Sequence, residues 1–134
     1  MGTAWLALTA ETGDRSGQVR DALARLEASP DIRIVARSTF GPAMAIGIET
    51  ILKPVALLDL CQAIELGMGR EHRAVWAPRS IDIDIIAFDD FEIRSPRLTL
   101  PHPFAHQRDF VLAPLREIAP QVADWVVTVN TKPR

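Results

Sequence analysis

The sequence predicts an α+β fold, in which helices pack on one face of an open, mainly antiparallel sheet. Apolar segments of strand length alternate with two longer segments of helical periodicity. Two strand-like segments in the middle of the chain are separated only by a short turn, which indicates a hairpin. The chain has 134 residues, of which 48% are hydrophobic and 24% charged. This length and composition suit a single domain, residues 1–134, around one core.

The first half of the chain predicts a strand, a helix and a hairpin. Residues 3–9 are apolar and end at a polar turn, so we expect a buried strand there. We expect a helix to begin at Ser16 as its N-cap and to end before Pro30. Its apolar face recurs at helical spacing in Val19, Ala22, Leu23 and Leu26. Residues 31–40 and 43–51 then read as two strands joined by the Gly41-Pro42 turn.

The second half predicts a longer helix, a strongly alternating strand and a mixed C-terminal region. Pro54 suits the first turn of a helix that Gly69 would end. Its apolar face comprises Leu57, Leu60, Cys61, Ile64 and Met68. Residues 80–88 alternate as a strand, and a loop rich in proline and histidine follows over 95–110. We expect a short helix at 111–117 and a last strand at 125–129, which completes a ferredoxin-like sandwich.

The charge balance argues against a nucleic-acid partner. The formal net charge is −2 and the isoelectric point is near 5.9, so no single-sign field is available to attract a nucleic-acid backbone. A small anionic ligand fits the composition better, because only Lys53 and Lys132 among the 15 basic residues are lysines. Arginine is the side chain best shaped for two-pronged contact with phosphate.

The cysteine count and the N-terminal segment point to an intracellular setting. Cys61 is the single cysteine, so one chain can form neither a disulfide framework nor a cysteine metal site. The segment before Glu11 has no basic start and is too short for a signal peptide or a membrane span. We therefore expect a cytoplasmic protein with no membrane partner.

Asp82 and Asp84 are the most informative pair of polar residues. They lie two apart on the strand at 80–88, so both carboxylates should project from one face, roughly 6–7 Å apart along the strand, while Ile81, Ile83 and Ile85 point the other way. Magnesium prefers a few carboxylate oxygens together with water and substrate phosphates. An isolated Asp-x-Asp pair is more often a charged, solvated strand face, so its neighbours have to decide between the two interpretations.

Those neighbours favour a metal-bridged polyphosphate. Cationic side chains surround the pair in sequence, namely Arg70, Arg73, Arg79, Arg97, His102 and Arg108. Metals can neutralise the inner phosphate oxygens while guanidinium groups hold the outer ones. Trp76 and Phe110 could stack on a planar heterocycle, although Phe110 taken alone is more easily explained as a core residue. Neither a Walker A sequence nor a Gly-x-Gly-x-x-Gly sequence occurs, so a nucleotide site would have to be built differently.

An ordered series of motifs resembles the 6-hydroxymethyl-7,8-dihydropterin pyrophosphokinase family. The resemblance extends over nearly the whole chain and includes Gln62 and Glu65 in the second helix. Its most specific segments are Gly69-Arg70, Trp76-Ala77-Pro78-Arg79-Ser80-Ile81-Asp82-Ile83-Asp84-Ile85, Arg97-Leu98-Thr99-Leu100-Pro101-His102, Arg108-Asp109-Phe110-Val111-Leu112 and Pro114-Leu115. The resemblance implies transfer of the β,γ-pyrophosphate of ATP to the hydroxymethyl group of the pterin, which releases AMP and uses two Mg²⁺ ions.

The resemblance also implies roles for individual residues. It implies that Asp82 and Asp84 bind the two metal ions. It also implies that Arg70 and Arg79 hold the phosphates and stabilise the charge that builds during transfer. Trp76 falls within its substrate-binding region, and Phe110 matches an aromatic residue that stacks on the pterin. The residues that would surround the nucleotide are Gln62, Glu65, Ile85, Arg97, Thr99, His102 and Arg108.

The sequence departs from the family pattern on the pterin side. Thr9-Ala10-Glu11 stands in place of Gly-Ser-Asn, and Ala43 occupies the position of an asparagine that hydrogen-bonds the pterin. Only Phe40-Gly41-Pro42 remains of a long loop that carries a second stacking aromatic. Losing an aromatic face and an amide would remove about 2–5 kcal/mol of pterin binding.

These departures leave three functions open. The chain could be a minimal pyrophosphokinase, or a degenerate relative that binds ATP and Mg²⁺ without catalysis and acts as a binding or regulatory module. A third hypothesis is an enzyme that transfers pyrophosphate to a different small acceptor. Formation of AMP that depends on magnesium and the pterin distinguishes the first hypothesis from the other two.

Overall fold

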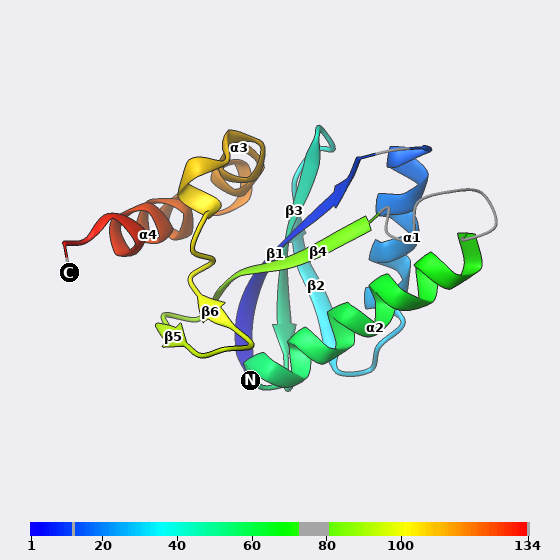
Figure 1. Ribbon diagram of the computed structural model, residues 1–134, viewed down its shortest axis with the longest axis horizontal. Coiled ribbons are helices and arrows are strands. Elements are labelled where there is room, and N and C mark those ends of the chain that lie inside the picture. The colour runs from blue at the N-terminus through cyan, green and yellow to red at the C-terminus, as the bar shows by residue number, and fades with distance from the viewer. Residues whose placement is uncertain (12, 73–80, 134) are drawn as a thin grey trace.

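A computed structural model describes residues 1–11, 13–72 and 81–133 of the chain, with the backbone alone for residues 70–72. Figure 1 shows a twisted sheet with helices on both sides. In chain order the elements are β1 (Gly2–Ala10), α1 (Arg15–Glu27), β2 (Ile32–Arg37), β3 (Ala43–Thr50), α2 (Pro54–His72), β4 (Ile81–Phe88), β5 (Ile93–Arg94), β6 (Thr99–Leu100), the 3-10 helix η1 (Ala105–Gln107), α3 (Asp109–Ile118) and α4 (Pro120–Thr131).

The main sheet has four strands in the order β2-β3-β1-β4, and each neighbouring pair is antiparallel. The predicted hairpin is confirmed as β2 and β3, and β5 pairs with β6 in a separate two-stranded sheet. With helices packed on this sheet, the structure confirms the predicted α+β fold of ferredoxin-like type. Strand β4 lies at an edge of the main sheet, where no strand of the described residues pairs with its outer side.

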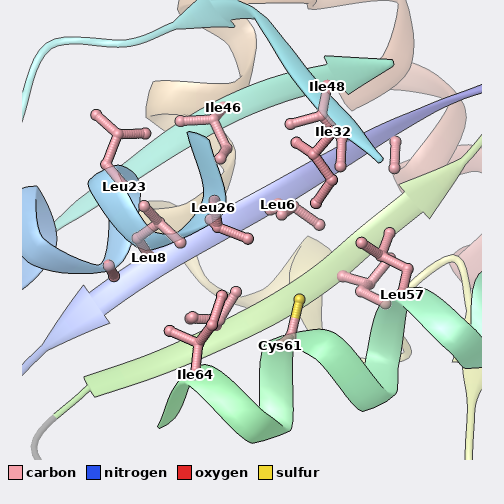
Figure 2. Packing of buried hydrophobic residues seen from close by; sticks show 14 of the residues in the cluster. Leu6, Leu8, Leu23, Leu26, Ile32, Ile46, Ile48, Leu57, Cys61 and Ile64 are labelled. Atoms are coloured by element: carbon pink, nitrogen blue, oxygen red, sulfur yellow. The ribbon is translucent and has the colours of Figure 1, made fainter. Parts of the chain in front are cut away.

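The larger hydrophobic cluster fills the space between one face of the sheet and helices α1 and α2. Figure 2 shows the side chains of the central strands meeting those of both helices. Labelled members are Leu6, Leu8, Ile46, Ile48, Leu23, Leu26, Leu57, Cys61 and Ile64, all buried. Each fully buried aliphatic side chain of this size contributes about 1.5–3 kcal/mol. Burial also raises the pKa of the Cys61 thiol to about 12, so the thiol stays protonated at neutral pH.

A second hydrophobic cluster lies on the opposite face of the sheet, under α3 and α4. The sheet contributes small residues here, Ala7 from β1 and Ala45 from β3, while the helices contribute Val111, Leu115 and Val126. Helix α3 contacts mainly β3, and α3 and α4 pack against each other. The expectation that helices cover one face alone is therefore wrong, since both faces are covered (Figure 1).

The predicted last strand at residues 125–129 is also wrong, because this segment is part of helix α4. The run Trp125-Val126-Val127 is rich in residues that favour strands, but Pro120 stands in the first turn, where proline favours a helix start. Ala119, Ala123 and Val126 follow one another at helical spacing and are buried together in the second cluster. Tertiary packing thus overrides the local strand propensity. Of the helices that the structure describes, none is long and apolar enough to cross a membrane.

Two predicted helix ends differ from the structure by a few residues. Helix α1 is capped by Asp14, whose Oδ1 accepts a hydrogen bond from the Gly17 N–H at 3.0 Å, so Ser16 lies inside the first turn. A carboxylate is the better cap here because it also interacts with the positive end of the helix dipole. Helix α2 continues past Gly69 to His72, since an isolated glycine weakens a helix without ending it.

A β-bulge interrupts the alternation of β4. Ile85 pairs with Leu6 and Ala87 pairs with Trp5, which leaves Ile86 as the extra residue. Ile85 and Phe88 belong to the first cluster, whereas Ile86 and Ala87 belong to the second. The bulge therefore lets one strand supply apolar side chains to both faces of the sheet.

The pairing of Trp5 with Gly47 predicts how the centre of the sheet responds to substitution. A Cβ atom at Gly47 would lie 2.5 Å from Cζ3 of Trp5, so Gly47→Ala should displace the indole and lower the free energy of unfolding by about 1–3 kcal/mol. Gly67→Ala is a suitable comparison, because its Cβ would meet only Arg25 Nη1 at 3.5 Å. It should stabilise α2 by about 0.5–1 kcal/mol. Urea unfolding of both variants tests the contrast, and equal effects would contradict it.

Candidate active site

Strand β4 carries the two aspartates at the exposed edge of the main sheet. Asp82 and Asp84 are half-buried, and they alternate with the buried Ile81 and Ile83. Asp84 is the cross-strand partner of Ala7, which belongs to the second cluster, so the pair occupies the same face of the sheet as α3 and α4. Both carboxylates therefore lie where a ligand can approach from beyond the edge of the sheet.

One open pocket gathers most of the residues that the resemblance places around a nucleotide. It has a volume of about 240 Å³ and lies between β4, α2 and the segment that contains β6. Side chains from three separate parts of the sequence line it, among them Asp84, Ile85, Arg97, Thr99 and His102. The side chain of Ile85 is 4% exposed and belongs mainly to the core, so it contributes an apolar wall.

Arg97 links this pocket to helix α2. Its Nη2 atom donates hydrogen bonds to Asp59 Oδ1 at 2.7 Å and to Gln62 Oε1 at 3.1 Å. The side chains of Arg97 and Asp59 are 50% and 59% exposed, and ion pairs at such exposed positions contribute about 0.2–1 kcal/mol to stability. The guanidinium can therefore exchange these contacts for a phosphate or another anionic group at little cost.

Glu65 holds the edge strand itself. Its Oε2 accepts a hydrogen bond of 2.7 Å from the backbone N–H of Ile83, the residue between the two aspartates. An edge strand has backbone donors without a neighbouring strand, and this carboxylate satisfies one of them. Glu65 thus contacts the segment of β4 that carries both aspartates.

His102 is fixed against β4 by its own backbone. Its N–H donates to the carbonyl of Ile86 at 2.8 Å, and its Nδ1 accepts from the N–H of Phe104 at 3.2 Å. Burial lowers the pKa of His102 below its usual value; Arg108 acts in the same direction and Asp84 opposes it. The ring is therefore mainly neutral at pH 7, and because Nδ1 accepts, the proton resides on Nε2.

Asn130 is a contributor that the sequence analysis missed. Its Nδ2 donates a hydrogen bond of 2.8 Å to the carbonyl oxygen of His102 from the last turn of α4. The helical spacing of Ala119, Ala123 and Val126 was the available signal, since it indicates the helix that carries residue 130. The C-terminal helix therefore supports one wall of the pocket.

A second pocket of about 230 Å³ lies between the β2–β3 turn and α3. Phe110 lines it from α3 and is 41% exposed, so the interpretation of Phe110 as a core residue is wrong. Phe40 lines it from the turn and is 39% exposed, a position that the sequence analysis did not foresee. The remaining walls are Thr39, Gly41, Pro42, Ala43, Ala113, Pro114 and Glu117.

A row of cross-strand partners runs from the aspartates to the second pocket. Asp82 of β4 pairs with Thr9 of β1, and Thr9 pairs with Ala43 of β3, which lines the second pocket. Two interstrand spacings separate Asp82 from Ala43, or roughly 10 Å. Ala7 and Ala45 continue the next row on the same face. Small side chains thus form the floor between the aspartates and the aromatic pocket.

Of the remaining predicted site residues, the structure describes the side chain of Arg108 alone. Arg108 is half-buried at the N-cap of α3 and close enough to lower the pKa of His102. Arg79 and Trp76 lie outside the described residues, and so does the side chain of Arg70. Among the described residues, no group of three or more histidine, cysteine, aspartate or glutamate side chains could hold a metal ion. A metal at Asp82 and Asp84 would thus need water or substrate oxygens as further ligands, as magnesium prefers.

Comparisons with known proteins identify the family of the chain. Residues 5–120 match the family model for 7,8-dihydro-6-hydroxymethylpterin-pyrophosphokinase. Three bacterial proteins named 2-amino-4-hydroxy-6-hydroxymethyldihydropteridine pyrophosphokinase are similar over most of their length. The protein of Methylorubrum extorquens is 39% identical, over 97% of this chain and 90% of its own. That of Bacillus subtilis is 35% identical over 96% and 84%, and that of Aquifex aeolicus is 37% identical over 91% and 83%.

The matched region contains β4, both pockets and the row of small residues between the aspartates and the second pocket. Its identity to these relatives exceeds 30% over more than two thirds of each chain. The chain therefore belongs to the 7,8-dihydro-6-hydroxymethylpterin-pyrophosphokinase family.

Proposed function

We propose that this chain transfers the β,γ-pyrophosphate of ATP to 6-hydroxymethyl-7,8-dihydropterin in folate biosynthesis and releases AMP. The observation that carries the proposal is the row from Asp82 through Thr9 to Ala43, which brings the aspartates of β4 within roughly 10 Å of the aromatic pocket, while Asp84 lines the polar pocket at the sheet edge. A transfer reaction needs its donor and its acceptor bound side by side, with their reacting atoms in contact.

The reaction is a displacement at phosphorus. The hydroxymethyl oxygen of the pterin forms a bond to the β-phosphorus of ATP, and the bond from that phosphorus to the oxygen bridging the α-phosphorus breaks. AMP leaves with the electron pair, and the hydroxyl proton passes to solvent. The protein has little covalent chemistry to perform in such a step, so positioning and charge stabilisation dominate.

Asp82 and Asp84 are the proposed ligands of two Mg²⁺ ions. The chemistry of the donor set fits, because two carboxylates on one strand face leave most coordination positions to water and phosphate oxygens. When bound, the ions would neutralise charge on the phosphate oxygens. The resemblance adds Arg70 and Arg79 as cations for the same phosphates.

The polar pocket is the proposed nucleotide site. Arg97 and the neutral His102 can donate hydrogen bonds to the nucleotide, and Thr99 adds a hydroxyl. Gln62 holds the guanidinium of Arg97, while Glu65 holds the strand between the aspartates. Arg108 completes the cationic side next to His102.

The aromatic pocket is the proposed pterin site. Phe110 supplies a face for stacking, as the resemblance implies, and Phe40 supplies a second aromatic face from the shortened turn. Trp76 is the remaining proposed substrate contact, on the resemblance alone. A retained aromatic pair argues against the degenerate binding module, as do relatives named as enzymes at 35–39% identity.

Removal of either aspartate should abolish most of the activity. Asp82→Asn and Asp84→Asn each remove a formal charge from the metal ligands, so AMP formation should fall by about 100-fold or more, equivalent to at least about 2.7 kcal/mol of transition-state stabilisation. The exposed Asp90→Asn is the matched control and should retain wild-type activity. A coupled assay for AMP with Mg²⁺, ATP and the pterin measures all three.

That assay also tests the proposed function as a whole. Wild-type protein that forms no AMP above background at high pterin concentration would reject the pyrophosphokinase and favour the binding module. Magnesium-dependent AMP formation with another small hydroxyl acceptor, and none with the pterin, would favour a different acceptor.

Truncation of either aromatic residue should affect the pterin and spare the nucleotide. Phe110→Ala and Phe40→Ala each remove a stacking face, and KM for the pterin should rise by about 5- to 15-fold, from a loss of about 1–1.5 kcal/mol. KM for ATP should stay within twofold. Phe91→Ala is a matched control, because Phe91 is also 41% exposed and stacks on Phe88 away from both pockets. An unchanged pterin KM in Phe40→Ala would remove Phe40 from the site.

Loss of the Asn130 hydrogen bond should loosen the wall that carries His102. In Asn130→Leu the His102 carbonyl loses a donor, so amide exchange in residues 102–105 should speed up and KM for ATP should rise about threefold to tenfold, the cost of one hydrogen bond. Thr128→Val, on the exposed side of α4, is the control. Identical exchange in the two variants would contradict a role for Asn130.

A further inference from the structure

Glu117 joins two parts of the chain that are distant in sequence. Its Oε1 accepts a hydrogen bond from the backbone N–H of Thr39 at 2.9 Å, and its Oε2 accepts one from the Thr39 hydroxyl, also at 2.9 Å. Thr39 belongs to the turn between β2 and β3, and Glu117 lies in the last turn of α3. A single carboxylate thus attaches the turn to the helix through both of its oxygens.

The two attached segments carry the two aromatic walls of the second pocket. Phe40 follows Thr39 directly, and Phe110 precedes Glu117 by two helical turns, so Phe110 and Glu117 lie on one face of α3. Thr39 and Glu117 line the same pocket themselves. The two hydrogen bonds therefore lie at the edge of the space between the aromatic rings.

The fold of the turn does not depend on Glu117. Ser38 is 5% exposed and organises the turn internally: its N–H donates to Ala45 O at 2.8 Å, and its hydroxyl accepts from Ala45 N–H and donates to Thr39 O, both at 2.9 Å. Gly41 N–H donates to Ala43 O at 3.3 Å. These bonds stay within the hairpin and do not fix its distance from α3.

Helix α3 is likewise fixed without the carboxylate. Val111, Leu112 and Leu115 are buried against the sheet in the second cluster. Two separately stable walls therefore face each other, and the bonds from Thr39 to Glu117 connect them. Such a connection acts on the width of the pocket rather than on the stability of either wall.

We propose that Glu117 is a positioning residue, which holds Phe40 opposite Phe110 so that the pterin pocket of this short-turn enzyme is formed before the substrate arrives. The inference rests on the proposed function, because it concerns the acceptor side of that reaction. A pre-formed pocket lowers the cost of ordering side chains on binding, so the benefit falls on pterin affinity. The metal and nucleotide side lies across the floor of the sheet and is not expected to respond.

The test compares Glu117→Gln with Thr39→Val and with their double variant. The glutamine retains one acceptor oxygen and turns an amide N–H₂ toward the second donor, so KM for the pterin should rise by about threefold to tenfold with kcat and KM for ATP within twofold of wild type. Thr39→Val loses the hydroxyl bond alone and should show a smaller rise. The double variant should resemble Glu117→Gln, because both changes break one connection.

Glu27→Gln is the matched control, since Glu27 is an exposed carboxylate that pairs with Arg37 of β2 outside the pocket. Amide exchange at Thr39 reports on the connection directly and should accelerate in Glu117→Gln. A wild-type KM for the pterin in Glu117→Gln, or an equal loss in kcat and in both KM values, overturns the positioning role. Wild-type protein that makes no AMP from the pterin instead rejects the proposed function, and this role with it.

Discussion

The edge position of β4 is the constraint on which the rest of the site depends. A strand at the edge of a sheet leaves one side open to ligands, but its backbone groups on that side still need hydrogen-bond partners. Here the Glu65 carboxylate satisfies the Ile83 N–H, and the His102 N–H satisfies the Ile86 carbonyl. Both partners belong to the proposed nucleotide side. The same contacts that protect the edge therefore also fix the aspartates relative to the groups that would surround the phosphates.

The two faces of the sheet carry side chains of different size. The face under α1 and α2 is filled with large aliphatic side chains and forms the main core. The opposite face carries buried alanines at Ala7, Ala43 and Ala45 and is covered by α3 and α4 (Figure 1). Small residues at these positions let the helices approach the sheet closely, and Ala43 leaves room for the aromatic pocket that it lines. The shortened β2–β3 turn contributes to this arrangement, because Phe40 reaches the pocket from the end of a strand and needs no long loop to carry it.

Local patterns in the sequence predicted the hairpin, the two long helices, the alternation of aspartates with isoleucines and the family. The features that they missed depend on contacts between distant residues. The C-terminal helix was misread because Trp125 to Val127 favours a strand, and only burial against α3 decides the outcome. No pattern near Thr39 indicates Glu117, which lies 78 residues away. Phe40 was counted as the remnant of a lost loop, since the sequence does not give the direction in which a turn points.

The bulge in β4 constrains the position of the histidine loop as well as the packing of the strand. Ile86 has no partner in β1, and its carbonyl is the acceptor that anchors His102. Deletion of that one residue would give a regular strand, in which Ile85 and Ala87 keep their present partners and the second cluster loses one side chain. The histidine loop, however, would lose its attachment point. The number of residues between Asp84 and Phe88 therefore sets the position of His102 as well as the packing of the strand.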